Sequence, residues 1–495
     1  MSVFNRFLAD RDGKPRFDLA LLLIVLSVPF FLLLGRLPLI EPDEGRYAEI
    51  PREMLLRGDF ITPCLNYVKY FEKPPLHYWL NAISMSLFGE NEFAARFPGT
   101  LLGLATVLLT YHVGRRLFDR RTGLFAALVL GTSAGFLVQA RLNFTDMTLT
   151  FCLSAALGCF ALASREEEPR QGFYYYLFYV FAALAVLAKG LIGIVLPGGI
   201  IFVYLLCSRR WQLLRLMRLA SGIPLFLLVA APWFILVSLH NPEFARFFFI
   251  HEHFERFLTK VHGRYQPFWF FVPVLIGCLF PWSFFLPAAV TGIWRQRASR
   301  VGDSRLYLFI WAIIIFLFFS KSNSKLIPYI LPVFPAVALL LGKAFADLME
   351  APPRLLRILA TVVAGVLLAA GAGMTLYPHL AARPAVTATT GAIIGILFFA
   401  EGAAALLSLR RSDVARFFAV LCLFSYLTGI AGILLVMPGV AEKKNTKGFG
   451  LIIRQLAPPE AVVATFGFEQ GLSFYAQRRI MVIGDRGELE FGSKQ

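Results

Sequence analysis

The sequence predicts an all-α polytopic membrane protein with about thirteen transmembrane helices and a small extracytoplasmic α/β module at its C-terminal end. Three observations lead to this prediction. Hydrophobic residues make up 58% of the 495 residues, and the mean hydropathy of +0.67 lies far from that of soluble domains. Apolar segments long enough to cross a hydrocarbon core of about 30 Å recur along the chain. After Pro438 the composition changes to short apolar runs that favour β-structure.

The expected spans are evenly distributed along the chain. They begin near Leu19, Phe97, Gly123, Met147, Phe173, Leu191, Leu219, Phe268, Leu306, Leu326, Leu355, Ala385 and Phe417. Alternate connections carry clusters of Lys and Arg, which lie in the cytoplasm by the positive-inside rule. The first span reads as an uncleaved signal anchor with its N-terminus inside. The C-terminal tail is then outside, together with the loops at 41–96, 140–146, 241–267, 320–325 and 377–384.

The basic residues of this chain reflect topology. The formal net charge is +17, but Lys and Arg are spread in small clusters between apolar runs, with no contiguous basic face. This distribution argues against nucleic acid as a partner and favours contact with anionic membrane lipid.

The C-terminal segment divides the chain into a membrane domain, residues 1–440, and a module, residues 441–495. Two runs, Ala461 to Phe466 and Ile480 to Ile483, favour strands, and a helix is expected from Gly448 to Leu456. About 50 residues bury too little apolar surface to form a sturdy core. The module is therefore expected to lean on the membrane domain or to be incomplete.

The loop after the first span contains an unusual density of acids, bases and aromatic residues. It reads EPDEGRYAEIPREM and, shortly after, KYFEKPPLHYW. A loop that only connects spans has no need of such a set, so the density predicts a site for a charged ligand. A juxtamembrane helix is expected from Glu44 to Leu56, in which Glu44, Glu49 and Glu53 are explained as an interfacial acidic cap at least as well as by function.

Asp43 differs from the acids that follow it. Pro42 stiffens its approach, and Arg46 and Tyr47 follow one helical turn later. A carboxylate with such neighbours can act as a base or hold a sugar, an amine or a metal.

Lys73 stands before Pro74-Pro75, a pair that keeps the segment from simply joining a helix. Beside Tyr70 and Glu72, Lys73 either extends toward the headgroups from a helix entry or binds a phosphate, and the phosphate role is preferred.

A second outer segment, Phe247 to Trp269, carries three His, two Glu and Arg256 on an aromatic background. Its H-E-H register differs from HExxH, which argues against a zinc protease. Two interpretations stay open: an interfacial aromatic cluster, or a transition-metal contact from His251 that a distant carboxylate such as Glu72 completes.

Further outer residues have charges that need an explanation. Asp146 lies at the end of a span, where an ionised acid is costly unless it is used or paired. Lys189 lies at an outer hinge between two spans, and Tyr329 follows two Lys in a short loop suited to a phosphate or a headgroup. All of these point to an extracytoplasmic site.

Together, EPDEGRYAE, EKPPLHYW, RLNFTDM, IHEHFERF and SKLIPYILP closely resemble the bacterial lipid A aminoarabinose transferases. With the protein O-mannosyltransferases, these form part of the polyprenyl-phosphate-dependent GT-C glycosyltransferases. The resemblance covers residues 15 to 490. It implies a GT-C fold with juxtamembrane helices and an external C-terminal domain, normally longer than the tail of this chain. It also implies a bacterial inner-membrane enzyme whose active site faces the periplasm.

The resemblance further implies the substrates and the roles of individual residues. The donor is undecaprenyl phosphate-linked 4-amino-4-deoxy-L-arabinose, the acceptor is a lipid A phosphate, and no nucleotide is needed. The implied roles are catalysis for Asp43 and Asp146, donor-phosphate binding for Lys73, Arg256 and Tyr329, cavity lining for Arg46, Tyr47, Tyr70 and Lys189, and binding of a divalent metal, expected to be zinc, for Glu72 and His251.

The chemistry of this transfer fits the residues. Cleavage of the anomeric C–O bond leaves undecaprenyl phosphate, whose growing charge needs cationic partners. A lipid A phosphate is already anionic, so Asp43 would grip the sugar amine; with a protein or glycan hydroxyl as acceptor, Asp43 would instead be the general base. A secondary transporter is a third alternative, but no two-fold repeat is visible in the sequence.

Overall fold

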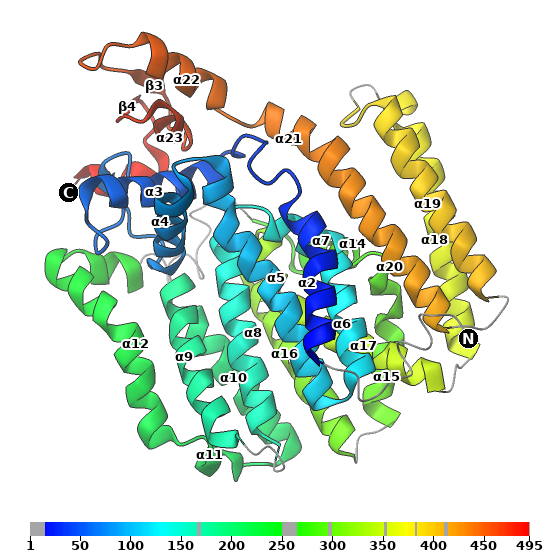
Figure 1. Cartoon of the computed structure of the whole chain (residues 1–495). Helices are drawn as coiled ribbons and strands as arrows, with labels where there is room; N and C mark the ends of the chain where they lie inside the picture. The colour runs from blue at the N-terminus through cyan, green and yellow to red at the C-terminus, as the bar shows by residue number, and fades with distance from the viewer. Residues whose placement is uncertain are drawn as a thin grey trace.

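A computed structural model of the chain describes residues 15–165, 170–249, 265–295, 299–350, 354–381, 384–409 and 414–494. Long helices run side by side, and short helices and strands gather at one end of them, which we call the outer end (Figure 1). Nine helical stretches in the described residues are long and apolar enough to cross a membrane, or up to eleven if each of two bent pairs is one span. These nine comprise α5 (Glu92–Leu117), α8 (Thr145–Ala163), α9 (Gln171–Lys189), α12 (Leu219–His240), α16 (Arg300–Lys321), η4 (Ile327–Val333) with α17 (Phe334–Glu350), α18 (Arg354–Leu380), α19 (Ala388–Leu409), and α20 (Val414–Ala431) with η5 (Gly432–Val436) and α21 (Met437–Lys443).

Two apolar helix pairs are sharply bent at a short break. One pairs α6 (Arg120–Thr132) with α7 (Ala134–Ala140) at 67°, and the other joins two helical stretches at 106°. The second pair consists of η2 (Phe268–Phe270), α14 (Phe271–Cys278), η3 (Trp282–Phe285) and α15 (Leu286–Arg295). Helices α2 (Pro15–Phe31) and α10 (Ile192–Ser208) are shorter, at 17 residues each. The polytopic helical architecture is confirmed, and the total of thirteen spans stays a prediction.

Small residues let the central helices approach closely. The spans that contain α8 and α17 are the most enclosed of those described. On α17, a Cβ added to Gly342 would lie 2.6 Å from the backbone nitrogen of Ala126 on α6, so only glycine fits this contact. Close backbone approach is the usual basis of helix association in a membrane, where lipid is as apolar as the side chains.

The outer end contains the predicted juxtamembrane helix. Helix α3 (Asp43–Arg57) corresponds to the helix expected from Glu44 to Leu56 and ends at Gly58, whose φ of 66° is left-handed. Strands β1 (Cys64–Leu65) and β2 (Val68–Lys69) form a short hairpin, and α4 (Leu76–Phe88) begins directly after the Pro74-Pro75 step.

The acidic cap was wrongly predicted. Glu44, Glu49 and Glu53 are fully buried instead of lying at a membrane interface. Burial is possible because each is hydrogen-bonded: Glu49 to Arg52, and Glu53 to the backbone N–H of Tyr67 at 3.0 Å. The partners of Glu44 are described below.

The C-terminal segment contains a β-α-β arrangement. The helix expected from Gly448 to Leu456 is α22 (Lys447–Leu456), and the two β-favouring runs contain β3 (Ala464–Phe466) and β4 (Met481–Ile483), which pair in parallel. Helix α23 (Leu472–Ala476) connects the strands, and the short turns η6 (Gly487–Leu489) and η7 (Gly492–Lys494) follow. The extracytoplasmic location of this segment stays a prediction.

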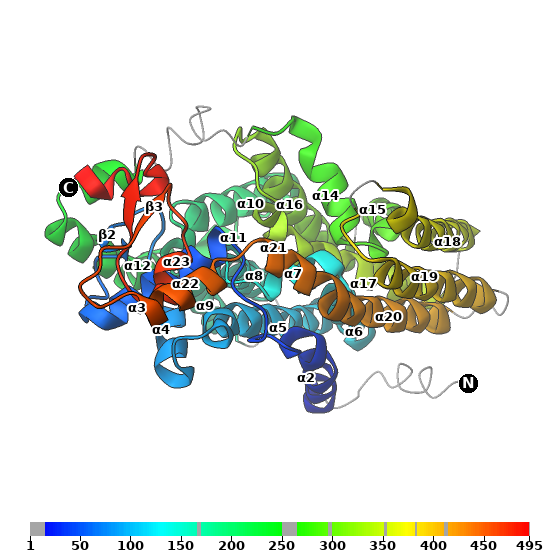
Figure 2. The ribbon, with the colours of Figure 1, turned by 90° about the horizontal axis from the view of Figure 1, so that it is seen from above.

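The C-terminal segment lies over α3 and α4 (Figure 2). Its polar contacts with the first outer loop, which we call the tail clamp, begin at Glu41, whose carboxylate accepts hydrogen bonds from the Thr446 hydroxyl and the Gly471 backbone, both at 2.8 Å. The Asn66 side chain exchanges two hydrogen bonds of 2.7 and 2.8 Å with the backbone of Ile480. The C-terminal segment therefore packs against the first outer loop of the membrane domain.

Candidate active site

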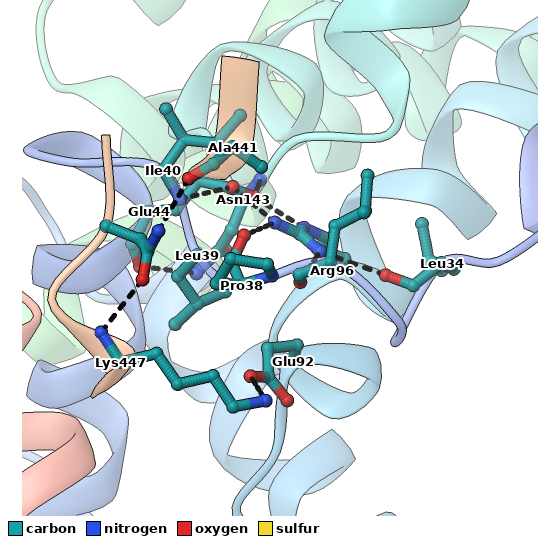
Figure 3. A network of polar contacts seen from close by, with 12 residues as sticks. Leu34, Pro38, Leu39, Ile40, Glu44, Glu92, Arg96, Asn143, Ala441 and Lys447 are labelled. Carbon is teal, nitrogen blue, oxygen red and sulfur yellow. Dashed lines mark hydrogen bonds and ion pairs between the residues drawn. The ribbon is translucent and has the colours of Figure 1, made fainter. Parts of the chain in front are cut away.

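Glu44 fixes the start of α3 beneath the candidate site. Its carboxylate accepts two hydrogen bonds from the Arg96 guanidinium on α5, at 2.8 and 2.7 Å, and one from the backbone of Asn143 at 2.9 Å (Figure 3). Arg96 also donates to the backbone carbonyls of residues 34, 37 and 38. A buried, bidentate and fully bonded ion pair gives geometric precision. The N-terminal turn of α3, which carries Asp43 and Arg46, is therefore held in a fixed position.

Arg46 lies at the centre of a first group of site residues. It is 5% exposed. Its guanidinium lies 3.5 Å from the carboxylate of Asp43, donates to the Tyr70 hydroxyl at 3.3 Å, and lies 3.0 Å from the carboxylate of Glu488. The predicted neighbourhood of Asp43 and Arg46 is present, and Tyr70 joins it from the loop before α4. Glu488, from the C-terminal segment, was not anticipated.

Asp146, Lys189 and Tyr329 form a second group. The Asp146 carboxylate, in the first turn of α8, forms an ion pair with Nζ of Lys189, the last residue of α9. That Nζ lies 4.6 Å from the centroid of the Tyr329 ring, which belongs to η4. Such a distance is within the range of a cation–π interaction. The structure thus supplies the partner that an acid at the end of a span requires.

Tyr47 lies between the two groups. Burial raises the pKa of its hydroxyl, and the nearby Asp43, Glu72 and Asp146 carboxylates add to that rise, whereas Arg46 opposes it. Its ring makes an edge contact with His77, with centroids 5.8 Å apart. Tyr47 therefore keeps its proton and is available as a hydrogen-bond donor.

His77 is a buried residue that the sequence did not single out. Its ring nitrogens lie 2.9 Å from the Asn143 side-chain oxygen and 3.0 Å from the Thr148 hydroxyl. Burial lowers the pKa of His77 to about 4, although Asn143 and Asp146 oppose this. The neutral imidazole of His77 therefore packs against the Tyr47 ring and helps to hold it in place. Within α4 nothing in the sequence distinguishes it from an interfacial histidine.

Lys73 and Glu72 lie half-buried just before α4. Nζ of Lys73 donates to the backbone carbonyl of Glu72 at 2.8 Å.

Arg256 and His251 lie outside the described residues, so their predicted roles remain predictions. Among the described residues, no group of three or more His, Cys, Asp or Glu side chains has a metal-holding geometry. The zinc site therefore stays a prediction, because His251, one of its two expected ligands, lies outside the described residues.

Segments far apart in the sequence therefore supply one array of acids, cations and hydroxyls. The first group and the second group come from α3, the loop before α4, α8, α9, η4 and η6. Carboxylates of this kind can take a proton or hold a cation, and the cations and hydroxyls can stabilise an anionic leaving group.

Comparisons with known proteins agree with this arrangement. Residues 72–236 match a family model described as dolichyl-phosphate-mannose-protein mannosyltransferase. The undecaprenyl phosphate-alpha-4-amino-4-deoxy-L-arabinose arabinosyl transferase of Edwardsiella ictaluri is 32% identical, over 95% of this chain and 86% of its own length. That of Pectobacterium carotovorum is 31% identical, over 97% of this chain and 87% of its own.

Solved structures show the same likeness. The crystal structure of ArnT from Cupriavidus metallidurans bound to undecaprenyl phosphate superimposes with a TM-score of 0.87 and 34% identity, covering 96% of this chain and 87% of that one. The archaeal oligosaccharyltransferase AglB from Archaeoglobus fulgidus has a TM-score of 0.54 at 15% identity and shares the fold alone.

Proposed function

Because the chain belongs to the family of undecaprenyl phosphate-α-4-amino-4-deoxy-L-arabinose arabinosyl transferases, we propose that it moves this aminosugar from undecaprenyl phosphate to a phosphate of lipid A. It is a multi-pass membrane glycosyltransferase. The proposed setting is the periplasmic face of the bacterial inner membrane. The observation that carries the donor assignment is the match over 96% of the chain to a transferase bound to undecaprenyl phosphate.

The proposed reaction is a single displacement. An oxygen of the acceptor phosphate attacks the anomeric carbon, the bond from that carbon to the donor phosphate oxygen breaks, and the electron pair leaves with undecaprenyl phosphate. One C–O bond forms as one breaks, and the anomeric configuration inverts. Lys73, Arg256 and Tyr329 stabilise the charge that grows on the leaving phosphate. No nucleotide takes part in this step.

Asp43 acts on the sugar. Its side chain is 30% exposed, and its contact with Arg46, at 3.5 Å, is the longer of the two carboxylate contacts that Arg46 makes. A carboxylate that is open on one side can accept a hydrogen bond from the ammonium group of the aminosugar. The acceptor phosphate is already ionised and needs orientation more than a base.

A hydroxyl acceptor on a protein or another glycan is the second candidate. The match of residues 72–236 to the mannosyltransferase model favours it. In that reaction Asp43 takes the proton of the attacking hydroxyl as general base.

The test is transfer of radiolabelled sugar by the purified protein in lipid nanodiscs. Undecaprenyl phosphate-linked 4-amino-4-deoxy-L-arabinose is the donor, and lipid A and a Ser/Thr-rich peptide are offered in parallel. Label that appears on lipid A and is absent from the peptide supports the proposal. Label on the peptide alone would replace the first candidate with the second, and no label on either acceptor would reject both.

A further inference from the structure

The C-terminal segment reaches into the candidate active site. Leu489 of η6 packs in a buried cluster with Tyr47, Tyr70 and Tyr78. Its neighbour Glu488 places one carboxylate oxygen 3.0 Å from Nε of Arg46 and 3.4 Å from the Tyr70 hydroxyl, which donates to it. The last few residues of the chain therefore touch the centre of the first group of site residues.

We propose that Glu488 is a positioning residue of the transferase site, which orients Arg46 and Tyr70 and leaves Asp43 available to the sugar. This inference rests on the proposed function, because Asp43 is the group whose availability it explains.

The two carboxylates beside Arg46 differ in a way that assigns their roles. The Glu488 side chain is 11% exposed and makes the shorter contact, whereas that of Asp43 is 30% exposed and makes the longer one. A buried guanidinium needs a close anionic partner, and removing that partner leaves an uncompensated charge. Glu488 supplies this partner. Without Glu488, Asp43 would become the close ion-pair partner of Arg46, and its carboxylate would no longer be available to bind the sugar.

Groups of both charges surround Glu488. The groups that face it are Arg46 and Asp43 from α3, Tyr70 and Glu72 from the loop before α4, and Gln470 from its own segment. Burial raises the pKa of Glu488 to about 7; Glu72 and Asp43 add to this, while Arg46 and Gln470 oppose it. Arg46, which opposes this rise, is thus a cationic group that favours the ionised form of Glu488.

The contact between Arg46 and Glu488 predicts a specific dependence of the reaction on both residues. Glu488→Gln removes the charge that pairs with Arg46 and weakens the charge-assisted hydrogen bond from Tyr70, so it lowers kcat about fivefold or more, with a smaller change in the donor KM.

The experiment measures kcat and donor KM for Glu488→Gln, Arg46→Met and the double variant in nanodiscs, together with hydrogen exchange of residues 447–494. Glu490→Gln is the matched control, because Glu490 lies two positions further on the same segment, is 64% exposed and pairs only with Lys494 among the described contacts. The expected result is a loss for Glu488→Gln, no change for Glu490→Gln, and a double variant no worse than Arg46→Met alone.

Three outcomes would overturn the inference. They are a wild-type kcat in Glu488→Gln, additive losses in the double variant, and a loss accompanied by increased exchange of residues 447–494, which would reduce Glu488 to a docking contact. Binding of undecaprenyl phosphate to the wild-type protein is measured beside these variants. Its absence, with no transfer to any acceptor, would instead remove the proposed function itself.

Discussion

The carboxylate of Asp146 is paired with the ammonium of Lys189, 43 positions further along the chain. The two residues stand at the first turn of α8 and the last turn of α9, which pack against each other, so the pair ties together the ends of two central helices. Because the Lys189 ammonium also lies over the Tyr329 ring, the pair orients a third element, η4. Lys189 therefore holds Asp146 and Tyr329 together at the ends of these helices.

Lys189→Met should destabilise the protein by about 3–5 kcal/mol, because it leaves the mostly buried Asp146 carboxylate without its cation. Adding Asp146→Asn should restore much of that stability, since the uncompensated charge disappears. Thermal unfolding in detergent measures both. A double variant as unstable as the sum of the single variants would contradict the pairing.

Asp43→Asn should lower transfer by at least about 100-fold, the scale expected when a catalytic carboxylate is lost. Its contact with Arg46 is long and its side chain partly exposed, so the unfolding temperature should hardly change. Asp59→Asn, the same substitution in the loop after α3, is the control. Near wild-type turnover in Asp43→Asn would reject a central role for this acid.

Lys73→Ala should raise the donor KM about tenfold or more, with a smaller effect on the acceptor KM. The lost contact is a charge-assisted one to phosphate, worth about 1.5–3 kcal/mol. Lys444→Ala, which removes an exposed ammonium near the tail clamp, should leave both KM values unchanged. The predicted role of Arg256 gives the same expectation for Arg256→Ala. If donor affinity is unchanged in both variants, the phosphate lies elsewhere.

Docking of the C-terminal segment should weaken as the pH rises. Burial raises the pKa of Glu41 from its usual 4.5 to about 7, although its bonds to Thr446 and Gly471 oppose this. The docked carboxyl thus holds its proton more tightly than the undocked one. Glu41 therefore contributes fully to the stability of docking below about pH 4.5, and this contribution is lost as the pH rises through about 7. Hydrogen exchange of residues 447–494 at pH 5 and pH 8, corrected for intrinsic rates, measures the difference in docking stability between the two pH values. Glu41→Gln should reduce the difference; an unchanged difference would remove Glu41 as its source.

A divalent metal, expected to be zinc, should copurify with the protein and be released on acidification below about pH 6, as the imidazole of His251 protonates. Elemental analysis at pH 7.5 and pH 5.5 measures the metal content. The double substitution of Glu72 and His251 by Ala should abolish it, whereas His240→Ala, at an exposed helix end, should not. Full activity in the double variant would show that the two residues only pack.

Much of the fold could be predicted because its causes are local. Apolar length alone indicated a polytopic helical protein, and the clustered acids and bases after the first span lie where the structure places the candidate site. The need of Asp146 for a partner was also predictable, since it follows from the cost of a charge at the end of a span.

The rest depended on contacts between distant segments. The pairing of Glu44 with Arg96 spans 52 positions and turned an expected surface cap into a buried anchor. Glu488 lies in a segment whose local composition resembles any polar turn, and nothing there indicates that Arg46 is its neighbour. Such partners emerge only once the helices have assembled, so single-sequence patterns cannot reveal them.

The tail clamp also joins parts of the chain that are made at very different times during synthesis. Glu41 and Gly471 are separated by 430 positions, and bacterial ribosomes extend a chain at about 5–20 residues per second, so roughly 20–90 s pass between their emergence. During that interval the first outer loop lacks its partner, while span after span enters the membrane. The contacts of Glu41 with Thr446 and Gly471 therefore form late in folding, after the segment that contains these two partners has been synthesised.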